Sequence, residues 1–120
     1  MHIIFGDAAT VISKNYTVLE LDTFKIPSKN KVVQSFCVVP ELPLNEYATL
    51  ENNKKIHSDL ITQYRAQNWE YCELAFQVLR GKFGGELDSF YDSLSQRVAE
   101  YKINPPGDNW DWTLTKELNE

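Results

Sequence analysis

The side chains that could do chemistry are few and scattered in this chain. Its two cysteines, Cys37 and Cys72, belong to no C-x-x-C motif, and His2 and His57 lie at no spacing typical of metal ligands. On its expected helix, Cys72 has no neighbouring His or Lys to activate it as a nucleophile. We therefore predict two reduced core thiols, no catalytic residue, and no metal or other cofactor.

Acidic side chains in the N-terminal part offer no stronger chemistry. Asp7, Glu20 and Asp22 could ligate a cation, but isolated carboxylates on half-exposed strands are usually solvated or cap a helix. The stretch GELDSFYDSL, residues 85–94, is likewise expected to begin a helix, whose dipole favours carboxylates at that end. These residues predict solvated positions rather than a metal site.

Tryptophans are the better candidates for binding. Trp69 falls at helical spacing with Cys72, so we expect it in the core rather than on a ligand-stacking platform. Trp110 and Trp112 alternate around Asp111 near the end of the chain. Exposed tryptophans are enriched at interfaces, so these two could form a protein interface or an intramolecular clasp, and the sequence leaves both open.

Composition excludes several classes of function. A chain of 120 residues with 42% hydrophobic residues and a net charge of −5 indicates an ordered globular domain. Nucleic acid is not an expected partner, because the longest basic cluster is the short turn around Lys25, Lys29 and Lys31. No stretch has the length of a membrane span and no signal peptide is apparent, so we expect a soluble cytoplasmic protein.

The first part of the chain, residues 1–40, is expected to form a small β-rich unit. HIIF is a short strand, and AATVISK is a short helix that Asp7 could cap. Residues 16–26 and 31–39 are two strands of an antiparallel hairpin joined by the turn sequence IPSKNK. Because apolar residues occupy both faces of the return strand, we expect both faces to be covered.

The remaining part, residues 41–120, is expected to form a helical module with an aromatic tail, because the period of the apolar residues changes from 2 to 3.6. Asn68 is placed to cap the second of three helices, and NPPGD ends the third. The three apolar stripes are Leu50, His57, Leu60, Ile61 and Tyr64; Trp69, Cys72, Phe76 and Leu79; and Leu87, Phe90, Tyr91, Leu94, Val98 and Tyr101. The sequence thus predicts an α+β fold, compact overall, with a β-hairpin unit followed by a helical hairpin plus one helix.

A hairpin with at most three strands is not expected to be stable without a covering partner. Its open edges also invite pairing with another strand. The interface candidates that follow from this reasoning are Trp110, Trp112, Val33, Cys37 and Phe24.

The run YTVLELDTFKIPSK, residues 16–29, resembles the C-terminal end of the class III adenylate/guanylate cyclase catalytic domain. In that family a strand and a short helix precede the pattern F-x-x-R-E-L-D-x-V-x-V-K-G-K and a final strand. The resemblance extends to the helical tail of many bacterial cyclases, part of which looks like a tetratricopeptide-type helical pair. The matching positions there are Tyr64, Trp69, Cys72, Phe76, Tyr91 and the run PPGDNWDW at 105–112.

The resemblance implies a chain without the family's catalytic residues. The metal-binding aspartates, the base-reading residues and the transition-state Asn and Arg of that family lie upstream of the matched stretch. Thr10 and Lys14, which fall where FGDAATVISK echoes the Asn and Arg segment, are the wrong types and too close to LELD. The first Lys of V-K-G-K corresponds to Pro27, which carries neither a cation nor an N–H.

These observations predict a non-catalytic protein-interaction or regulatory module related to the end of a cyclase. Its expected partner is a second copy, paired through a sheet edge, or a cyclase-like protein. The alternative is a small nucleotide- or ligand-sensing module with a cleft between the hairpin and the helices, which the sequence does not favour. A minimal enzyme ranks third.

Overall fold

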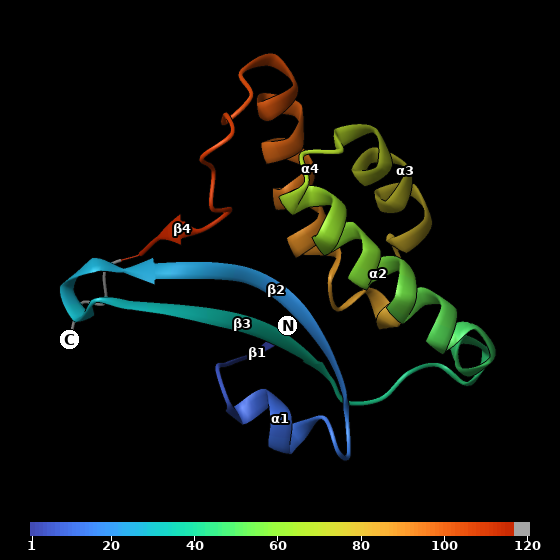
Figure 1. The fold of residues 1–120 in the computed structure, drawn as a ribbon. Coiled ribbons are helices and arrows are strands. Elements are labelled where there is room, and N and C mark those ends of the chain that lie inside the picture. The colour runs from blue at the N-terminus through green and yellow to red at the C-terminus, as the bar shows by residue number, and fades with distance from the viewer. Residues whose placement is uncertain (117–120) are drawn as a thin grey trace. The chain divides into compact units, whose positions relative to one another are not determined.

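The structure is a computed structural model that describes residues 1–116. It confirms the predicted α+β class, with a four-stranded sheet, a short helix and three longer helices (Figure 1). The chain divides into two compact units. The sheet unit comprises residues 1–40 and the tail from Asp111, and the helical unit comprises residues 41–110.

The sheet has the strand order β1-β3-β2-β4. β1 (His2–Phe5) and β2 (Thr17–Ile26) both pair antiparallel with β3 (Lys31–Val39). β4 (Leu114–Thr115) pairs parallel with β2. The sequence assigned the whole tail to the helical module, whereas the structure pairs β4 with the sheet. A two-residue strand has too little pattern of its own to be found without its partner.

Short connections shape the sheet unit. The turn between β2 and β3 contains a 3₁₀ turn over Pro27–Lys29 and ends at Asn30, which has a positive φ of 49°. Helix α1 (Ala8–Ile12) follows β1, as expected. Asp7 stands at its N-cap position but its side chain makes no capping hydrogen bond, so that part of the prediction is wrong.

A β-bulge interrupts β2. The register passes from Glu20 opposite Phe36 to Thr23 opposite Gln34, so β2 carries one extra residue there. Leu19 therefore lies opposite Cys37, and Phe24 lies opposite Val33. Since Cys37 and Val33 are four residues apart on one strand, Leu19 and Phe24 share a face although they are five residues apart.

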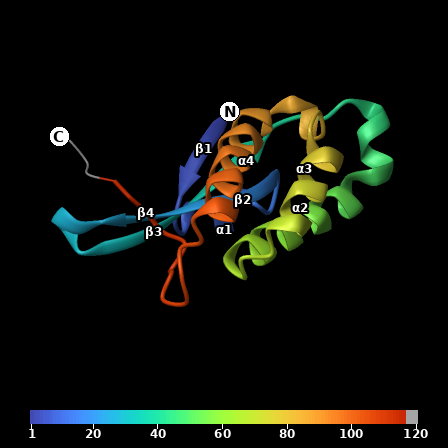
Figure 2. The same ribbon diagram turned by 90° about the horizontal axis from the view of Figure 1, so that it is seen from above.

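The helical unit consists of α2 (Leu50–Arg65), α3 (Trp69–Leu79) and α4 (Asp88–Ile103), with α3 in contact with both of the others (Figure 2). The Asn68 side chain accepts a hydrogen bond from the Tyr71 N–H, which confirms the predicted cap. The predicted stripes supply the buried residues His57, Leu60, Ile61, Tyr64, Cys72, Phe76, Leu79, Leu87, Phe90, Tyr91, Leu94 and Val98.

One carboxylate joins the start of the helical unit to the loop after α3. The Glu46 carboxylate accepts hydrogen bonds from the N–H groups of Phe83, at 2.7 Å, and Gly84, at 3.0 Å. Phe83 and Gly84 both have positive φ, at 53° and 65°. Consecutive residues of this kind point their N–H groups into one concavity, which suits a carboxylate.

No helix within residues 1–116 combines the length and apolar character needed to cross a membrane.

Candidate binding groove and open edge of the sheet unit

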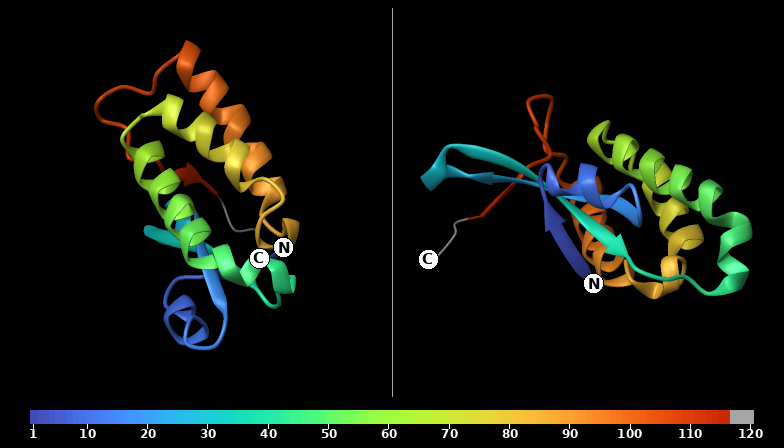
Figure 3. Two further views of the ribbon diagram at one scale, coloured as in Figure 1. Left: turned by 90° about the vertical axis from the view of Figure 1, so that its right-hand side faces the viewer. Right: turned by 90° about the horizontal axis from the view of Figure 1, so that it is seen from below.

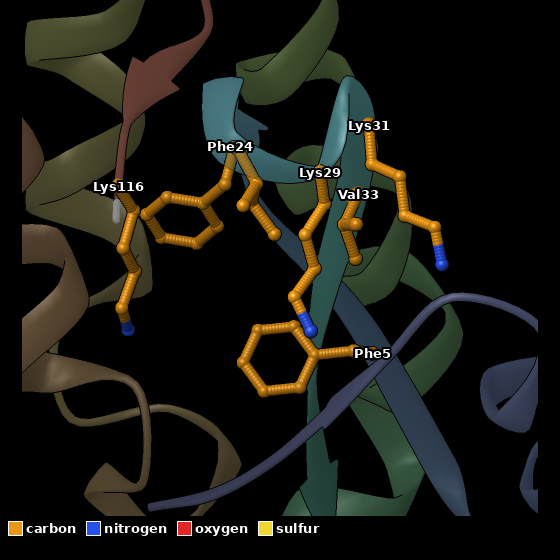
Figure 4. A pocket seen from close by; sticks show the side chains of 7 residues that line it. Phe5, Phe24, Lys29, Lys31, Val33 and Lys116 are labelled. Atoms are coloured by element: carbon orange, nitrogen blue, oxygen red, sulfur yellow. The ribbon is translucent and has the colours of Figure 1, made fainter. Parts of the chain in front are cut away.

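A groove of about 340 Å³ lies on the sheet unit, and its floor is apolar. The floor is formed by Phe5 at the end of β1, by Phe24 and Ile26 of β2, and by Val33 of β3 (Figure 4). Phe24 faces Val33 across the ladder only because the bulge in β2 has changed which residues face this side. The groove therefore depends on that one irregularity of the sheet.

Three lysines surround this apolar floor. Lys29 lies in the turn between β2 and β3, Lys31 begins β3, and Lys116 follows β4. The Lys116 ammonium lies 5.4 Å from the centre of the Phe24 ring, within the range of a cation–π contact. No Asp or Glu among the described residues lines the groove. In a chain of net charge −5, the described lining of the groove thus carries only positive formal charges.

The tail brings Lys116 to the groove. The Lys116 N–H donates a 2.9 Å hydrogen bond to the carbonyl of Lys25, which continues the parallel pairing of β4 with β2. Lysine ammonium groups bind anions, and the apolar floor offers neither a nucleophile nor a general base.

The outer edge of β1 is the second feature of the sheet unit that could engage another molecule (Figure 3, right). The Gly6 N–H donates to the carbonyl of Gln34 at 2.9 Å, which continues the register that ends with Phe5 opposite Ser35. Because hydrogen-bonded pairs alternate along an antiparallel ladder, His2 and Ile4 also direct their backbone groups towards β3. Ile3 and Phe5 therefore direct theirs away from the sheet.

The side chains on this edge are apolar and exposed. Ile3 is 47% exposed and Phe5 is 49% exposed, and both lie on the face that carries Cys37. β1 contains no Lys, Glu, Asp, Pro or bulge, which are the features that usually protect an edge from pairing.

The interface candidates proposed from the sequence are dispersed in the structure. Phe24 and Val33 lie together in the groove, whereas Cys37 is fully buried. Trp110 belongs to an aromatic cluster of the helical unit, with its ring centre 5.0 Å from that of Tyr64 and 5.3 Å from that of Tyr101. These contacts lie within the chain, as in the intramolecular clasp that is one of the two roles left open for Trp110. Trp112 belongs to the sheet unit and is 36% exposed.

Trp69 packs in the same cluster. Its ring stacks on Tyr101 at 5.4 Å and meets Tyr64 edge-on at 5.8 Å. With Trp110 also at 5.7 Å, the Trp69 ring has three aromatic neighbours but is only half-buried, so it packs at the margin of the helical core rather than inside it as the spacing predicts.

The remaining reactive side chains are held by structural contacts. His57 is buried, and its Nδ1 lies 2.9 Å from the Tyr91 hydroxyl. Burial raises the pKa of the Cys72 thiol to about 12, so the thiol is protonated and unreactive at neutral pH. Within the described part of the chain, no three His, Cys, Asp or Glu side chains are grouped so that they could hold a metal ion.

Sequence reasoning missed Phe5 and Lys116 as groove residues. It identified Lys29 and Lys31 only as part of a short basic turn. A signal was present in β2, where apolar residues fall at 19 and 21 and then at 24 and 26, so that the alternation changes phase between them. Such a change of phase within one strand is typical of a bulge.

No family model, curated protein or solved structure matches this chain. The resemblance of its first part to the end of a class III cyclase domain therefore stays a prediction.

Proposed function

We propose that this chain is a non-catalytic protein-interaction module that pairs with a second copy of itself through the open edge of β1. The observation that carries the proposal is the outward direction of the Ile3 and Phe5 backbone groups beside exposed apolar side chains. An added strand would satisfy these groups and cover part of that apolar surface.

Only every second residue of β1 directs its backbone groups outward, and this restricts how two copies can pair. An antiparallel partner must place a hydrogen-bonded pair at Ile3 or at Phe5. Three registers with two-fold symmetry do so: Ile3 against Ile3 of the second copy, Ile3 against Phe5, or Phe5 against Phe5. All three keep the exposed apolar side chains of the two copies on one face, where they contact each other across the new strand pair.

The contact is short, because β1 has only four residues. Few hydrogen bonds and a small buried area are typical of weak, transient interfaces. We therefore expect a reversible dimer whose population rises with protein concentration.

A cyclase-like protein as an alternative partner is supported only by the sequence resemblance, and it would use the same edge. Both cysteines are free thiols, which suits the reducing cytoplasm that we assign to this module.

The test is sedimentation equilibrium over a wide range of protein concentrations. Ile3→Pro removes an N–H that points away from β3, so it should abolish dimers while the pairing of β1 with β3 is retained. Ile3→Lys should do the same by placing a charge on the edge. Val11→Lys is the matched control, because Val11 is an exposed apolar residue of α1, at 64% exposure, away from the edge.

Protection of the Gly6 amide from hydrogen exchange reports whether β1 still pairs with β3 in each variant. A chain that stays monomeric at every concentration would overturn the proposal. Dimers that persist equally in both Ile3 variants would also overturn it.

A further inference from the structure

We infer that the groove lined by Phe5, Phe24, Val33 and the three lysines binds a small organic anion with a hydrocarbon body, such as a medium-chain carboxylate. The groove and the proposed pairing share the Phe5 side chain, whereas the lysines and the rest of the floor belong to the groove and the outward backbone groups of β1 belong to the pairing. It assigns a ligand class to this site.

The size of the groove sets the size of the ligand. Small-molecule sites span roughly 300–1,000 Å³, and a cavity of roughly 150 Å³ holds one benzene ring. The 340 Å³ of this groove therefore suits a body of about ten carbon atoms rather than a lipid with two chains.

The floor sets the chemistry of the body. The side chains of Phe5, Phe24, Ile26 and Val33 contain no hydrogen-bonding group. A nucleobase would lose water from its polar edges there without gaining a partner, whereas a hydrocarbon would gain from leaving water. The floor therefore favours a hydrocarbon over the nucleotide that the sequence left as an alternative ligand.

The lysines set the charge of the ligand. Figure 4 shows the Lys116 side chain beside the Phe24 ring and the Lys29 side chain reaching towards Phe5. With no carboxylate among the described lining residues, the charge complementary to this margin is negative. A ligand with an apolar body and one anionic group at its end suits both the apolar floor and the surrounding lysines.

The test uses decanoate below its micelle concentration, with binding followed by amide chemical shifts. We expect saturable shifts at Phe5, Phe24 and Val33. Decanol removes the charge and decyltrimethylammonium inverts it, so decanol should bind several-fold more weakly and the cation should not bind. Adenosine monophosphate and an acidic peptide carrying one Phe test the other ligand classes.

Single-residue variants distinguish specific binding at the groove from non-specific binding to the surface. Lys31→Gln and Lys116→Gln should each raise the dissociation constant by roughly threefold, as loss of one exposed ion pair would. Lys14→Gln, an exposed lysine of the turn after α1, is the matched control and should leave it unchanged. Ile3→Pro should also leave it unchanged, which keeps failure of this inference distinct from failure of the proposed pairing.

Several results would overturn the inference. Equal binding of decanol and decanoate would show apolar adhesion only. Equal effects of Lys14→Gln, Lys31→Gln and Lys116→Gln would show a non-specific charge effect. Absence of decanoate binding, or saturable shifts at these residues with the nucleotide or the peptide alone, would remove the assigned ligand class.

Discussion

The Lys25 ammonium lies 2.8 Å from a carboxylate oxygen of Asp111, a residue 86 positions further along the chain. The other carboxylate oxygen of Asp111 accepts hydrogen bonds from the hydroxyl of Thr113, at 2.7 Å, and from its N–H, at 3.2 Å. The Lys25 carbonyl in turn accepts from the Lys116 N–H. One residue of β2 thus holds the tail by both its side chain and its backbone.

Acid should weaken this attachment. The hydrogen bond from Lys25, followed by those from Thr113, lowers the pKa of Asp111 from 3.8 to about 2. A carboxyl whose pKa is lower in the folded chain stabilises the fold above its ordinary pKa. The stabilisation is lost as the pH falls through about 2. We expect the Lys116 amide to be protected from exchange at pH 6 and to lose protection as the pH falls from 4 to 2.

Asp111→Asn should reduce the protection of the Lys116 amide already at pH 6. Asp108→Asn, a change at an exposed aspartate of the helical unit, serves as the control and should have no effect. Unchanged protection in Asp111→Asn would show that the strand pairing alone holds the tail.

Removal of the Trp110 ring should destabilise the helical unit. Trp110 contacts the rings of Tyr64, Trp69 and Tyr101. Truncation of a fully buried Trp costs about 3–5 kcal/mol, so for this half-buried ring we expect Trp110→Ala to cost about 2 kcal/mol. Urea unfolding followed by circular dichroism measures this loss in the free energy of unfolding. Trp112→Ala is the matched control, with an expected cost below about 1 kcal/mol because its ring is partly exposed.

Equal shifts of the urea midpoint for Trp110→Ala and Trp112→Ala would contradict the clasp.

Neutralising Glu46 should loosen the loop after α3. Glu46→Gln keeps the shape of the side chain but replaces two hydrogen bonds to a charged acceptor, from Phe83 and Gly84, by at most one to a neutral oxygen. We expect a loss of about 1–2 kcal/mol in the free energy of unfolding and faster exchange of the Gly84 amide. Glu41→Gln, at an exposed position, should change neither. An unaltered Gly84 amide would show that the loop holds its backbone conformation without the carboxylate.

The Cys72 thiol should limit stability in alkali. Its pKa is raised from 9.0 to about 12, chiefly by burial. Folding therefore favours the protonated thiol, and its contribution is fully present below pH 9 and lost as the pH rises through about 12. Iodoacetamide should accordingly modify the folded chain at pH 8 far more slowly than the urea-unfolded chain. The single variants Cys72→Ala and Cys37→Ala each leave one thiol, so comparing them shows which thiol reacts.

Rapid modification of Cys72 in the folded chain would mean that the thiol is reached by solvent through local opening.

Much of the fold could be predicted from the sequence, because its main elements carry their own periodicity. The stripe of His57, Leu60, Ile61 and Tyr64 repeats at helical spacing, and each of these residues is buried where the stripe places it. The turn after β2 is likewise local, since Pro and Asn favour the conformations found there.

The groove could not be predicted in the same way, since it depends on register and on a distant partner. The bulge in β2 determines whether Phe24 faces the same side as Leu19, and only pairing with β3 fixes its position. Lys116 reaches the groove through a two-residue strand. The sequence of that strand, Leu114–Thr115, does not identify β2 as its neighbour.

Because β4 returns to β2, the helical unit is an insertion within the sheet unit, entered at residue 41 and left at residue 110. The two units are thus covalently connected twice. A single proteolytic cut near residue 41 would leave the helical unit on the fragment that carries β4, held to the sheet by β4–β2 pairing. A cut near residue 110 would instead leave the helical unit covalently joined to residues 1–40 and free the tail except for that pairing. Exchange of residues 41–110 for a short flexible linker would be the direct way to ask whether the sheet unit, with its groove and edge, folds by itself.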